Sequence, residues 1–540
     1  MSSRPGDDAR SWWQDAVIYQ IYPRSFADAD GDGLGDLRGV IERLSYLRFL
    51  GVDAVWISPF FRSPMVDFGY DISDHTAVDP LFGSETDAEA LIAATHSAGL
   101  RLIVDIVLSH TSDQHPWFRS ASSSRTAPMR DYYVWRDGPT PGSARGGPPN
   151  NWTAGFPSGS SAWTWHPGTA QWYLHSHLPQ QPDLDWSNAA VRAAQLDVVR
   201  YWLDRGVDGI RLDAINRLGK DPEYGDNNAN QPSRQQDWPT LHNYLREVRA
   251  LVDEYSNRLI VGEVWEFEQR RILPYLAPDE LDLAHNFVFA RSPFDAEEIR
   301  RTVEEFADLA GPNVWPAWFL NNHDEPRIVS RWAAAGDDGR TRDRKGRLAA
   351  MLLLTLRGTP FLYQGEELGL PDTELAPGVG SDRNGRDPQR TPMPWAPPSE
   401  AGPGAGFSTG VPWLPVGDTA EERNVATASE APGSMLTLYR ELLALRRARR
   451  SLRAGNQTMV DLGRNVLAYL RSAGEEQTLV VMNFSATTCV LDLRAVLGPA
   501  RTVRPLLSTS RGAQPIHLQE LTIGVSFCSG TIFEVAAAAD

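Results

Sequence analysis

The stretch GVDGIRLDAIN, residues 206–216, has the pattern of a short buried strand that ends on charged side chains. Its apolar run finishes with Arg211 and Asp213, and side chains two residues apart on a strand lie on the same face. The next residue, Ala214, is small. The pattern predicts a strand that brings a cation and an acid to one rim of a sheet.

Seven further short apolar runs occur along the chain, with amphipathic stretches of helical period between many of them. These seven runs begin at Ala16, Asp53, Leu100, Arg258, Leu281, Ala317 and Thr359, and the run from Gly206 makes eight. Alternating strands and helices predict a parallel sheet, and eight repeats predict a closed (β/α)8 TIM barrel of the α/β class. An open doubly wound sheet is disfavoured because the sequence carries no glycine-rich phosphate loop.

Two long interruptions and a change of pattern indicate the domain organisation. Residues 109–181 lack helical period and are rich in Pro, Gly, Ser and Trp, and residues 370–427 are again rich in Pro and Gly. A helix is expected from Met435 to about Arg453, and the chain beyond Gly455 alternates short strands with turns. We therefore expect a barrel over residues 1–108 and 182–454, a loop-rich inserted subdomain B over 109–181, and a C-terminal antiparallel β-sandwich over 455–540.

The composition points to an acidic, soluble protein with a neutral or cationic ligand. The 540 residues carry a formal net charge of −17, which argues against nucleic acid or an anionic membrane as a partner. Two cysteines do not make a disulfide framework, and the chain shows neither a secretory signal nor an apolar run of the roughly 18 residues that a membrane span needs. We expect a cytoplasmic protein, either a monomer or a homodimer.

Three acids fall where strands of the predicted barrel end, which is where active sites lie in this fold. Asp213 ends the fourth strand, Glu263 the fifth, and Asp324 the seventh. A single acid after a strand usually caps a helix. Three acids on one rim repel one another, which raises the pKa of at least one of them; because this repulsion costs stability, a structural role does not account for the group. Paired carboxylates of this kind cleave glycosidic bonds, one as the nucleophile and the other as the proton donor. Arg211 would keep Asp213 ionised.

The segment DADGDGLGD, residues 28–36, has the alternating spacing of a calcium loop. Gly33 stands at the sharp turn, but the twelfth position of an EF-hand, which needs an acid, is Gly39. The alternative is a solvated acidic turn that caps the following helix. The expected oxygen ligands come from Asp28, Asp30, Asp32, the carbonyl of Leu34, and Asp36.

In these features the chain resembles glycoside hydrolase family 13, the α-amylase superfamily, over nearly its whole length. The motifs are DIVLSH, QPDLDW, GIRLDAIN, GEVW, NNHDE and GTPFLYQGEELG, and QPDLDW is close to the hallmark of the oligo-1,6-glucosidase and α-glucosidase group. Ser109 and Asp185 depart from the usual asparagines, which bears on fine specificity but not on the reaction class.

The resemblance implies a role for each site residue. Asp213 would be the nucleophile, Glu263 the acid/base and Asp324 the transition-state stabiliser. A calcium ion, sometimes read as magnesium, would occupy the acidic loop in a structural role. The residues around the glucose at the non-reducing end would be Asp67, Tyr70, His110, Phe156, Arg211, His323 and Arg386, with Arg390 an alternative to Arg386.

The implied activity is that of a retaining exo-α-glucosidase, with transglucosylation possible. Within the resembling group, Val after the nucleophile goes with α-1,6 bonds and Ala or Thr with α-1,4 bonds, so Ala214 predicts preference for maltose and maltooligosaccharides. Alternatives on the same scaffold are an oligo-1,6-glucosidase, a trehalose synthase and a sucrose isomerase, although no isomerase-like RLDRD run occurs. A non-catalytic transporter subunit is disfavoured because all three acids are present.

Overall fold

The computed structural model describes residues 10–155, 158–498, 501–510, 516–517 and 521–537. Eight parallel strands form one sheet, and each begins within one of the eight predicted runs. The sheet order is β11, β10, β9, β5, β2, β1, β13, β12, and a parallel bridge from His285 to Ala317 links its two ends. The predicted α/β barrel is therefore confirmed. Its strands are β1 (Ile18–Ile21), β2 (Ala54–Ile57), β5 (Arg101–Val107), β9 (Gly209–Asp213), β10 (Leu259–Gly262), β11 (Leu283–Ala284), β12 (Ala317–Phe319) and β13 (Thr359–Tyr363).

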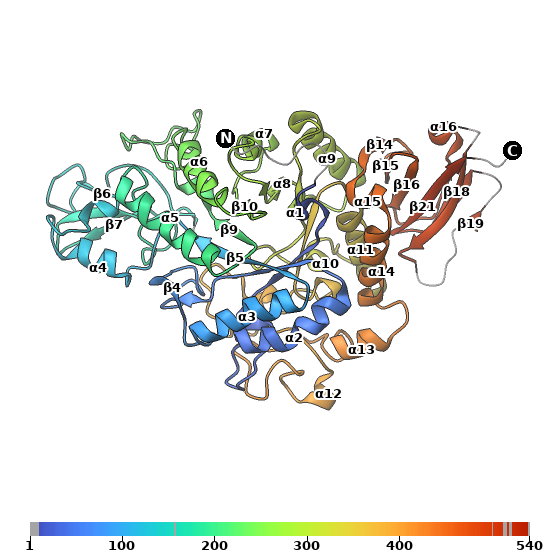
Figure 1. Cartoon of the computed structure of the whole chain (residues 1–540), viewed down its shortest axis with the longest axis horizontal. Helices are drawn as coiled ribbons and strands as arrows, with labels where there is room; N and C mark the ends of the chain where they lie inside the picture. Colours follow the sequence, from blue (N-terminus) through green and yellow to red (C-terminus); the bar gives the residue numbers. More distant parts are fainter. Residues whose placement is uncertain (1–9, 156–157, 499–500, 511–515, 518–520, 538–540) are drawn as a thin grey trace.

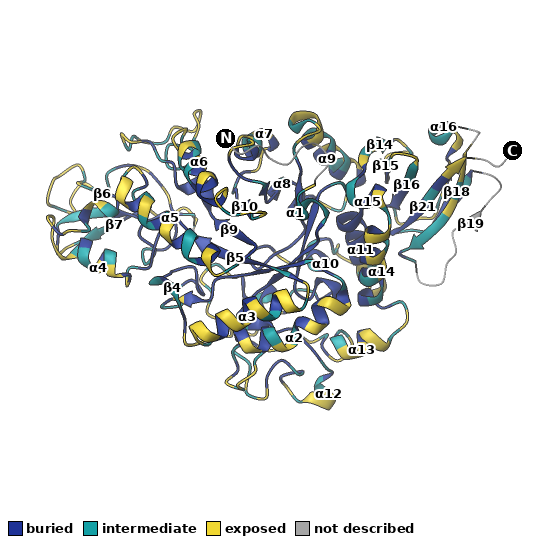
Figure 2. Cartoon of the chain, in the orientation of Figure 1, coloured by how far each residue is buried: buried dark blue, intermediate teal, exposed yellow. Residues whose placement is uncertain are grey.

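Helices surround the sheet and bury their apolar faces against it, as the burial colours in Figure 2 show. Local signals set several helix ends. The Asp36 carboxylate accepts from the Gly39 N–H at 2.7 Å at the start of α2, and Gly51 ends α2 with a left-handed φ of 99°. The main helices are α2 (Leu37–Leu50), α3 (Glu85–Ser97), α5 (Ala189–Asp204), α6 (Leu241–Val252), α9 (Ala296–Ala310), α11 (Gly339–Thr355) and α14 (Met435–Ala448).

Shorter pieces complete the barrel. The predicted helix from Met435 to about Arg453 is in fact two, because Arg449 is extended (φ −106°, ψ 115°) and separates α14 from α15 (Arg450–Ala454). The remaining short elements are α1 (Trp12–Asp15), η1 (Pro23–Ser25), β3 (Phe61–Arg62), β4 (Asp74–Val78), η3 (Ile215–Arg217), α7 (Gln269–Ile272), η4 (Leu273–Leu276), α8 (Phe287–Ala290), α10 (Ile328–Arg331), η5 (Glu366–Leu368), η6 (Asp387–Gln389), α12 (Pro398–Ala401) and α13 (Val425–Glu430).

The insertion after β5 lies beside the barrel, at the opposite side from the C-terminal strands (Figure 1). It contains the antiparallel strands β6 (Trp135–Arg136), β7 (Trp163–His166) and β8 (Gln171–Leu174), together with η2 (Arg130–Tyr132). Although its sequence lacks helical period, the insertion also contains the short helix α4 (Pro116–Ser123). Pro116 occupies the first helical position and the His115 side chain accepts from the Trp117 N–H.

The C-terminal strands are antiparallel and follow α15. One sheet has the order β14, β15, β16, β21, β18 and a second the order β17, β20, β19, and apolar residues of both share one core. Cys489 and Cys528, both in this region, are free thiols. The elements are β14 (Asn456–Val460), β15 (Val466–Ala473), β16 (Glu476–Asn483), β17 (Cys489–Asp492), α16 (Arg494–Leu497), β18 (Arg501–Ser508), β19 (Ile516–His517), β20 (Thr522–Val525) and β21 (Ser529–Ala537).

Candidate active site

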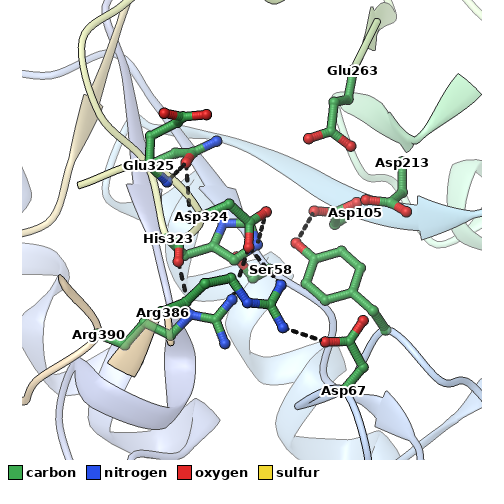
Figure 3. A network of polar contacts seen from close by, with 12 residues as sticks. Ser58, Asp67, Asp105, Asp213, Glu263, His323, Asp324, Glu325, Arg386 and Arg390 are labelled. Carbon is green, nitrogen blue, oxygen red and sulfur yellow. Dashed lines mark hydrogen bonds and ion pairs between the residues drawn. The ribbon is translucent and has the colours of Figure 1, made fainter. Parts of the chain in front are cut away.

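The register of three neighbouring strands brings the charged residues of the rim together. Arg211 on β9 pairs with Asp105 on β5 and with Val261 on β10. Glu263 stands two residues after Val261, as Asp213 stands two after Arg211, so the two acids lie at the same level of the barrel. Figure 3 shows their carboxylates pointing into a common space with that of Asp324.

One fully buried guanidinium, that of Arg211, contacts three carboxylates. Its Nη1 lies 2.8 Å from Asp105 Oδ1 and 2.6 Å from Asp213 Oδ1, and its Nη2 lies 3.0 Å from Glu263 Oε2. A buried guanidinium with carboxylates on both nitrogens is fixed in position and fixes its partners in turn. Arg211 itself does not line the cavity of the site, so it acts from beneath the acids.

Glu263 and Asp213, two of the acids that contact Arg211, have different protonation states because burial raises their pKa values by different amounts. Burial raises the pKa of Glu263 to about 8 and that of Asp213 to about 6, with Arg211 opposing the shift in both cases. At neutral pH Glu263 therefore holds a proton and Asp213 is ionised. The Ala214 N–H donates to Glu263 Oε2 at 3.0 Å, and Arg211 Nη2 contacts the same oxygen, so Oε1 is the atom that can carry the proton. A proton donor beside an ionised carboxylate is the pair that glycosidic cleavage needs.

Asp324 follows β12 and is held ionised by cations of the second long loop. Arg386 Nη1 and Arg390 Nη2 each lie 2.8 Å from its Oδ1, and His323 Nε2 lies 3.2 Å from its Oδ2. Burial disfavours the charge, but the His323 ring in its protonated form and the two guanidinium groups outweigh burial and hold the pKa of Asp324 below its usual value. At neutral pH, where His323 is uncharged, the two guanidinium groups keep Asp324 ionised. Asp324 thus supplies a permanent negative charge to the site (Figure 3).

Arg386 joins three acids at one end of the site. It contacts Asp67 at 2.5 Å, Asp324 at 2.8 Å and Asp382 at 2.7 Å. Arg390, the alternative left by the sequence, is 1 % exposed and donates to the His323 carbonyl, so of the two arginines it is Arg386 that lines the cavity. Asp382 was not predicted, because it lies in a Pro- and Gly-rich loop without a motif.

Tyr70 and His323 are stacked rings at the base of the site. Their centroids lie 5.3 Å apart with an angle of 2° between the planes, and the Tyr70 hydroxyl donates to Asp105 Oδ2 at 3.0 Å. Gln20 Nε2 lies 2.7 Å from His323 Nδ1. Burial lowers the pKa of His323 to about 3, so this ring is neutral at physiological pH.

A cavity of about 260 Å³ opens between these groups. Seven of the predicted residues line it, namely Asp67, Tyr70, His110, Asp213, Glu263, Asp324 and Arg386. Phe156 lies outside the described residues. Ala214, which the sequence analysis connects with linkage preference, also lines the cavity. Lining residues that were not predicted are Gly155, Ser158, His177, Gln181, Asn216, Arg217 and Trp265. Gln181 could have been found, since it begins the QPDLDW motif and donates to Asp67 Oδ2 at 3.0 Å.

The acidic loop before α2 brings three of its four aspartates together. Carboxylate oxygens of Asp28, Asp30 and Asp36 all lie within 4.8 Å of one another. Asp32 is not part of this group, and its side chain accepts from the Leu34 N–H at 2.7 Å. Asp36 also caps α2, which confirms that the loop caps the following helix.

Comparison with known proteins agrees with this geometry. The family model for the α-amylase catalytic domain matches residues 20–455, and that for the C-terminal domain of maltogenic amylase matches residues 458–523. Within the described part of the chain, no helix has the length and apolar character to cross a membrane.

The similar proteins include glucosidases, a trehalose-6-phosphate hydrolase, an α-glucosyl transfer enzyme and a trehalulose synthase. A probable α-glucosidase of Rhizobium meliloti is 42 % identical over 92 % of this chain and 93 % of its own, and trehalose-6-phosphate hydrolase of Escherichia coli is 39 % identical over 87 % and 90 %. Among solved structures, an α-glucosyl transfer enzyme matches with a TM-score of 0.88 at 38 % identity, covering 98 % of this chain and all of the other. Trehalulose synthase of Pseudomonas mesoacidophila matches with 0.90 at 34 % identity and the same coverage. The chain therefore belongs to glycoside hydrolase family 13, the α-amylase family, and is a glycoside hydrolase with α-glucosidases among its homologues.

Proposed function

We propose that the protein is a retaining exo-α-glucosidase that releases glucose from the non-reducing end of short α-1,4-linked glucosides. The observation that carries the proposal is the pair on Arg211: a protonated Glu263 and an ionised Asp213, held by adjacent nitrogens of one guanidinium. Neither an inert acidic cap nor a simple binding pocket requires two acids in opposite protonation states.

The proposed reaction is a double displacement. Asp213 attacks the anomeric carbon while Glu263 gives its proton to the leaving oxygen, which forms a covalent glucosyl-enzyme. Glu263, now ionised, takes a proton from water, and the water attacks the anomeric carbon and frees Asp213. The permanently charged Asp324 stabilises the positive charge that develops on the sugar ring in both steps. A sugar hydroxyl in place of the water gives transglucosylation.

The exo mode follows from the group around Arg386. Asp67, Asp324 and Asp382 surround the Arg386 guanidinium, and Asp67, Asp324 and Arg386 line a cavity of about 260 Å³. Charged groups fixed in this way can bind the hydroxyls of one terminal glucose, which would end the substrate chain at this point of the cavity. The opposite side, formed by residues after β9 and β10, would then receive the aglycone, the part of the substrate beyond the cleaved bond.

Ala214 supports the α-1,4 preference. It lines the cavity directly after the proposed nucleophile, and its backbone is left-handed, with a φ of 42°. A methyl side chain leaves the start of the aglycone side open, whereas a β-branched residue would narrow it. Oligo-1,6-glucosidases, trehalose-6-phosphate hydrolases and a trehalulose synthase are also among the relatives, so activity on α-1,6-linked glucose, on trehalose or by isomerisation of sucrose is the second candidate.

The acidic loop is proposed as a structural Ca²⁺ site, with Mg²⁺ as the other candidate ion. A set of carboxylates and a backbone carbonyl fits these hard cations. Asp28, Asp30 and Asp36 would hold the ion, and Asp32 and the Leu34 carbonyl could join after a small rearrangement. The ion would stabilise the turn that leads into α2.

A substrate panel tests the proposed function. Maltose, maltotriose, isomaltose, sucrose and trehalose are incubated separately with the enzyme, and the products are resolved by chromatography. We expect the highest kcat/KM on maltose and maltotriose, with glucose and the shortened sugar as first products. Preferred cleavage of isomaltose would overturn the linkage assignment, and conversion of sucrose or maltose to an isomer without release of glucose would overturn the hydrolase assignment.

A further inference from the structure

Arg217 is a buried cation of the cavity without a dedicated partner. It is the last residue of η3, immediately after the strand that carries Asp213, and only 7 % of it is exposed. Its Nη1 is buried and makes no hydrogen bond to any residue that the structure describes. Arg211 and Arg386 each contact three carboxylates, whereas no carboxylate of the described residues forms an ion pair with Arg217.

The two acids whose charges act on Arg217 already form ion pairs with other cations. Asp183 and Glu266 both act on the Arg217 guanidinium at a distance. Asp183 lies 3.0 Å from Lys220 Nζ, and Glu266 lies 2.6 Å from Arg271 Nε. Neither acid therefore satisfies the unpaired N–H of Arg217, and a buried donor without an acceptor is destabilising.

The fold leaves space for this guanidinium. A methyl group placed on Gly155, in the insertion, would lie 3.2 Å from Arg217 Nη2, so a larger residue at that position would press on the guanidinium. Arg217 and Gly155 both line the cavity that holds Asp213 and Glu263. The side chain is thus held between η3 and the insertion, and it borders the cavity in which a substrate would bind.

We propose that Arg217 is a specificity-determining residue whose guanidinium donates to an oxygen of the aglycone. The inference rests on the proposed α-glucosidase function and adds to it the chemical class of the aglycone. Arg217 follows Asp213 in the chain and lines the cavity with Ala214 and Asn216, in the segment that leaves β9, whereas Asp67 and Arg386, which would hold the glucose, come from the loops after β2 and β13. The acceptor is a sugar hydroxyl or a phosphate oxygen on the leaving group, and an aryl leaving group offers neither.

The test compares three substrates in the full-length enzyme: maltose, maltose with a 6-phosphate on its reducing glucose, and phenyl α-D-glucoside. Arg217→Met should lower kcat/KM on the better of the two sugars by roughly 10- to 100-fold, as expected for loss of a hydrogen bond to a charged donor. On phenyl α-D-glucoside it should change kcat/KM by less than about threefold, because that leaving group makes no such bond. Arg217→Lys should recover part of the loss.

Arg234→Met is the matched control, since Arg234 belongs to the same connection, pairs with Asp221 at 2.6 Å and does not line the cavity. If Arg217→Met loses the preference of the native enzyme for the phosphorylated sugar, the acceptor is a phosphate, and if it loses activity on maltose, the acceptor is a hydroxyl. An equal loss on all three substrates, or no loss on either sugar, overturns the inference. A native enzyme without activity on maltose and phenyl α-D-glucoside overturns the proposed function instead.

Discussion

The backbone N–H of Ala214 donates to Glu263 Oε2 at 3.0 Å, so the residue after the proposed nucleophile orients the proposed acid. The contact spans two neighbouring strands, and it depends on the left-handed turn of Ala214 at the end of β9. The nucleophile, the proposed linkage selector and the N–H that orients the acid therefore lie in one short segment, residues 211–217. Changes in this segment should alter specificity and the chemical step together.

The first prediction concerns linkage. Ala214→Val should raise the ratio of kcat/KM on isomaltose to that on maltose by about tenfold or more, because the β-branched side chain narrows the aglycone side. A β-branched residue is strained at a φ of 42°, so the melting temperature should also fall. Initial rates on both sugars, measured beside a thermal melt, separate the two effects. An unchanged ratio would show that Ala214 does not select the linkage.

The pH profile should be bell-shaped. Asp213 must be ionised to attack, so kcat/KM should fall as the pH drops through its pKa of about 6. Glu263 must be protonated to assist the leaving group, so kcat/KM should fall as the pH rises through its pKa of about 8. With Glu263→Gln and a substrate whose leaving group needs no proton, the alkaline limb should disappear while the acid limb stays. An alkaline limb that persists in this variant argues against Glu263 as the acid.

Replacement of the nucleophile should separate activity from stability. Asp213→Asn should reduce kcat by ~10⁴-fold or more, as expected when a group that forms the covalent bond is removed. The melting temperature should stay nearly constant or rise slightly, because burial disfavours the charge on Asp213 and Arg211 keeps Asp105 and Glu263 as partners. Turnover of maltose and a thermal melt measure both. An active Asp213→Asn enzyme would contradict the assignment.

Asp382 should act as a positioning residue through Arg386. Its Oδ1 lies 2.7 Å from Arg386 Nη2, and its Oδ2 accepts from the Arg386 N–H at 2.7 Å. Asp382→Asn should weaken the hold on that guanidinium and lower kcat/KM by about tenfold, mainly through a higher KM, with a matching rise in the inhibition constant of glucose. Glu374→Gln, on an exposed part of the same loop, is the control. A fall in kcat alone would contradict a role in binding.

Chelation should destabilise the acidic loop if it holds a metal. Removal of divalent ions should lower the melting temperature by a few degrees, and added Ca²⁺ should restore it in a concentration-dependent way. Asp30→Asn should blunt this response, whereas Asp279→Asn, at an exposed acid far along the chain, should not. If the melting temperature of the native enzyme does not change when a chelator is added, the loop does not hold a stabilising metal and only caps α2.

The sequence was informative wherever the signal is local. Eight apolar runs gave the eight strands, since a strand buried on both faces leaves a nearly continuous apolar pattern. Asp213, Glu263 and Asp324, which line one cavity, could be predicted to lie together because a parallel barrel gathers its strand ends on one rim. Helix α4 was missed because its eight residues are too few to display a helical period.

Other site features depend on contacts between distant segments. Asp382 and Arg386 lie within four residues of each other, but only the folded loop shows that together they face Asp67, more than 300 residues away. Arg217 is an ordinary polar residue in the sequence, and its unpaired donor becomes evident only when the insertion closes over it. Such features require the three-dimensional arrangement, because no spacing or composition encodes them.

The anomeric form of the first glucose released from maltose tests the central claim most directly. Double displacement through Asp213 and Glu263 retains the configuration at the anomeric carbon. Proton NMR of the early time course should therefore show α-glucose formed first from the non-reducing end, with β-glucose appearing only as the sugar mutarotates. Initial release of β-glucose from that end would mean a single displacement by water, and it would contradict the role of Asp213 as the nucleophile.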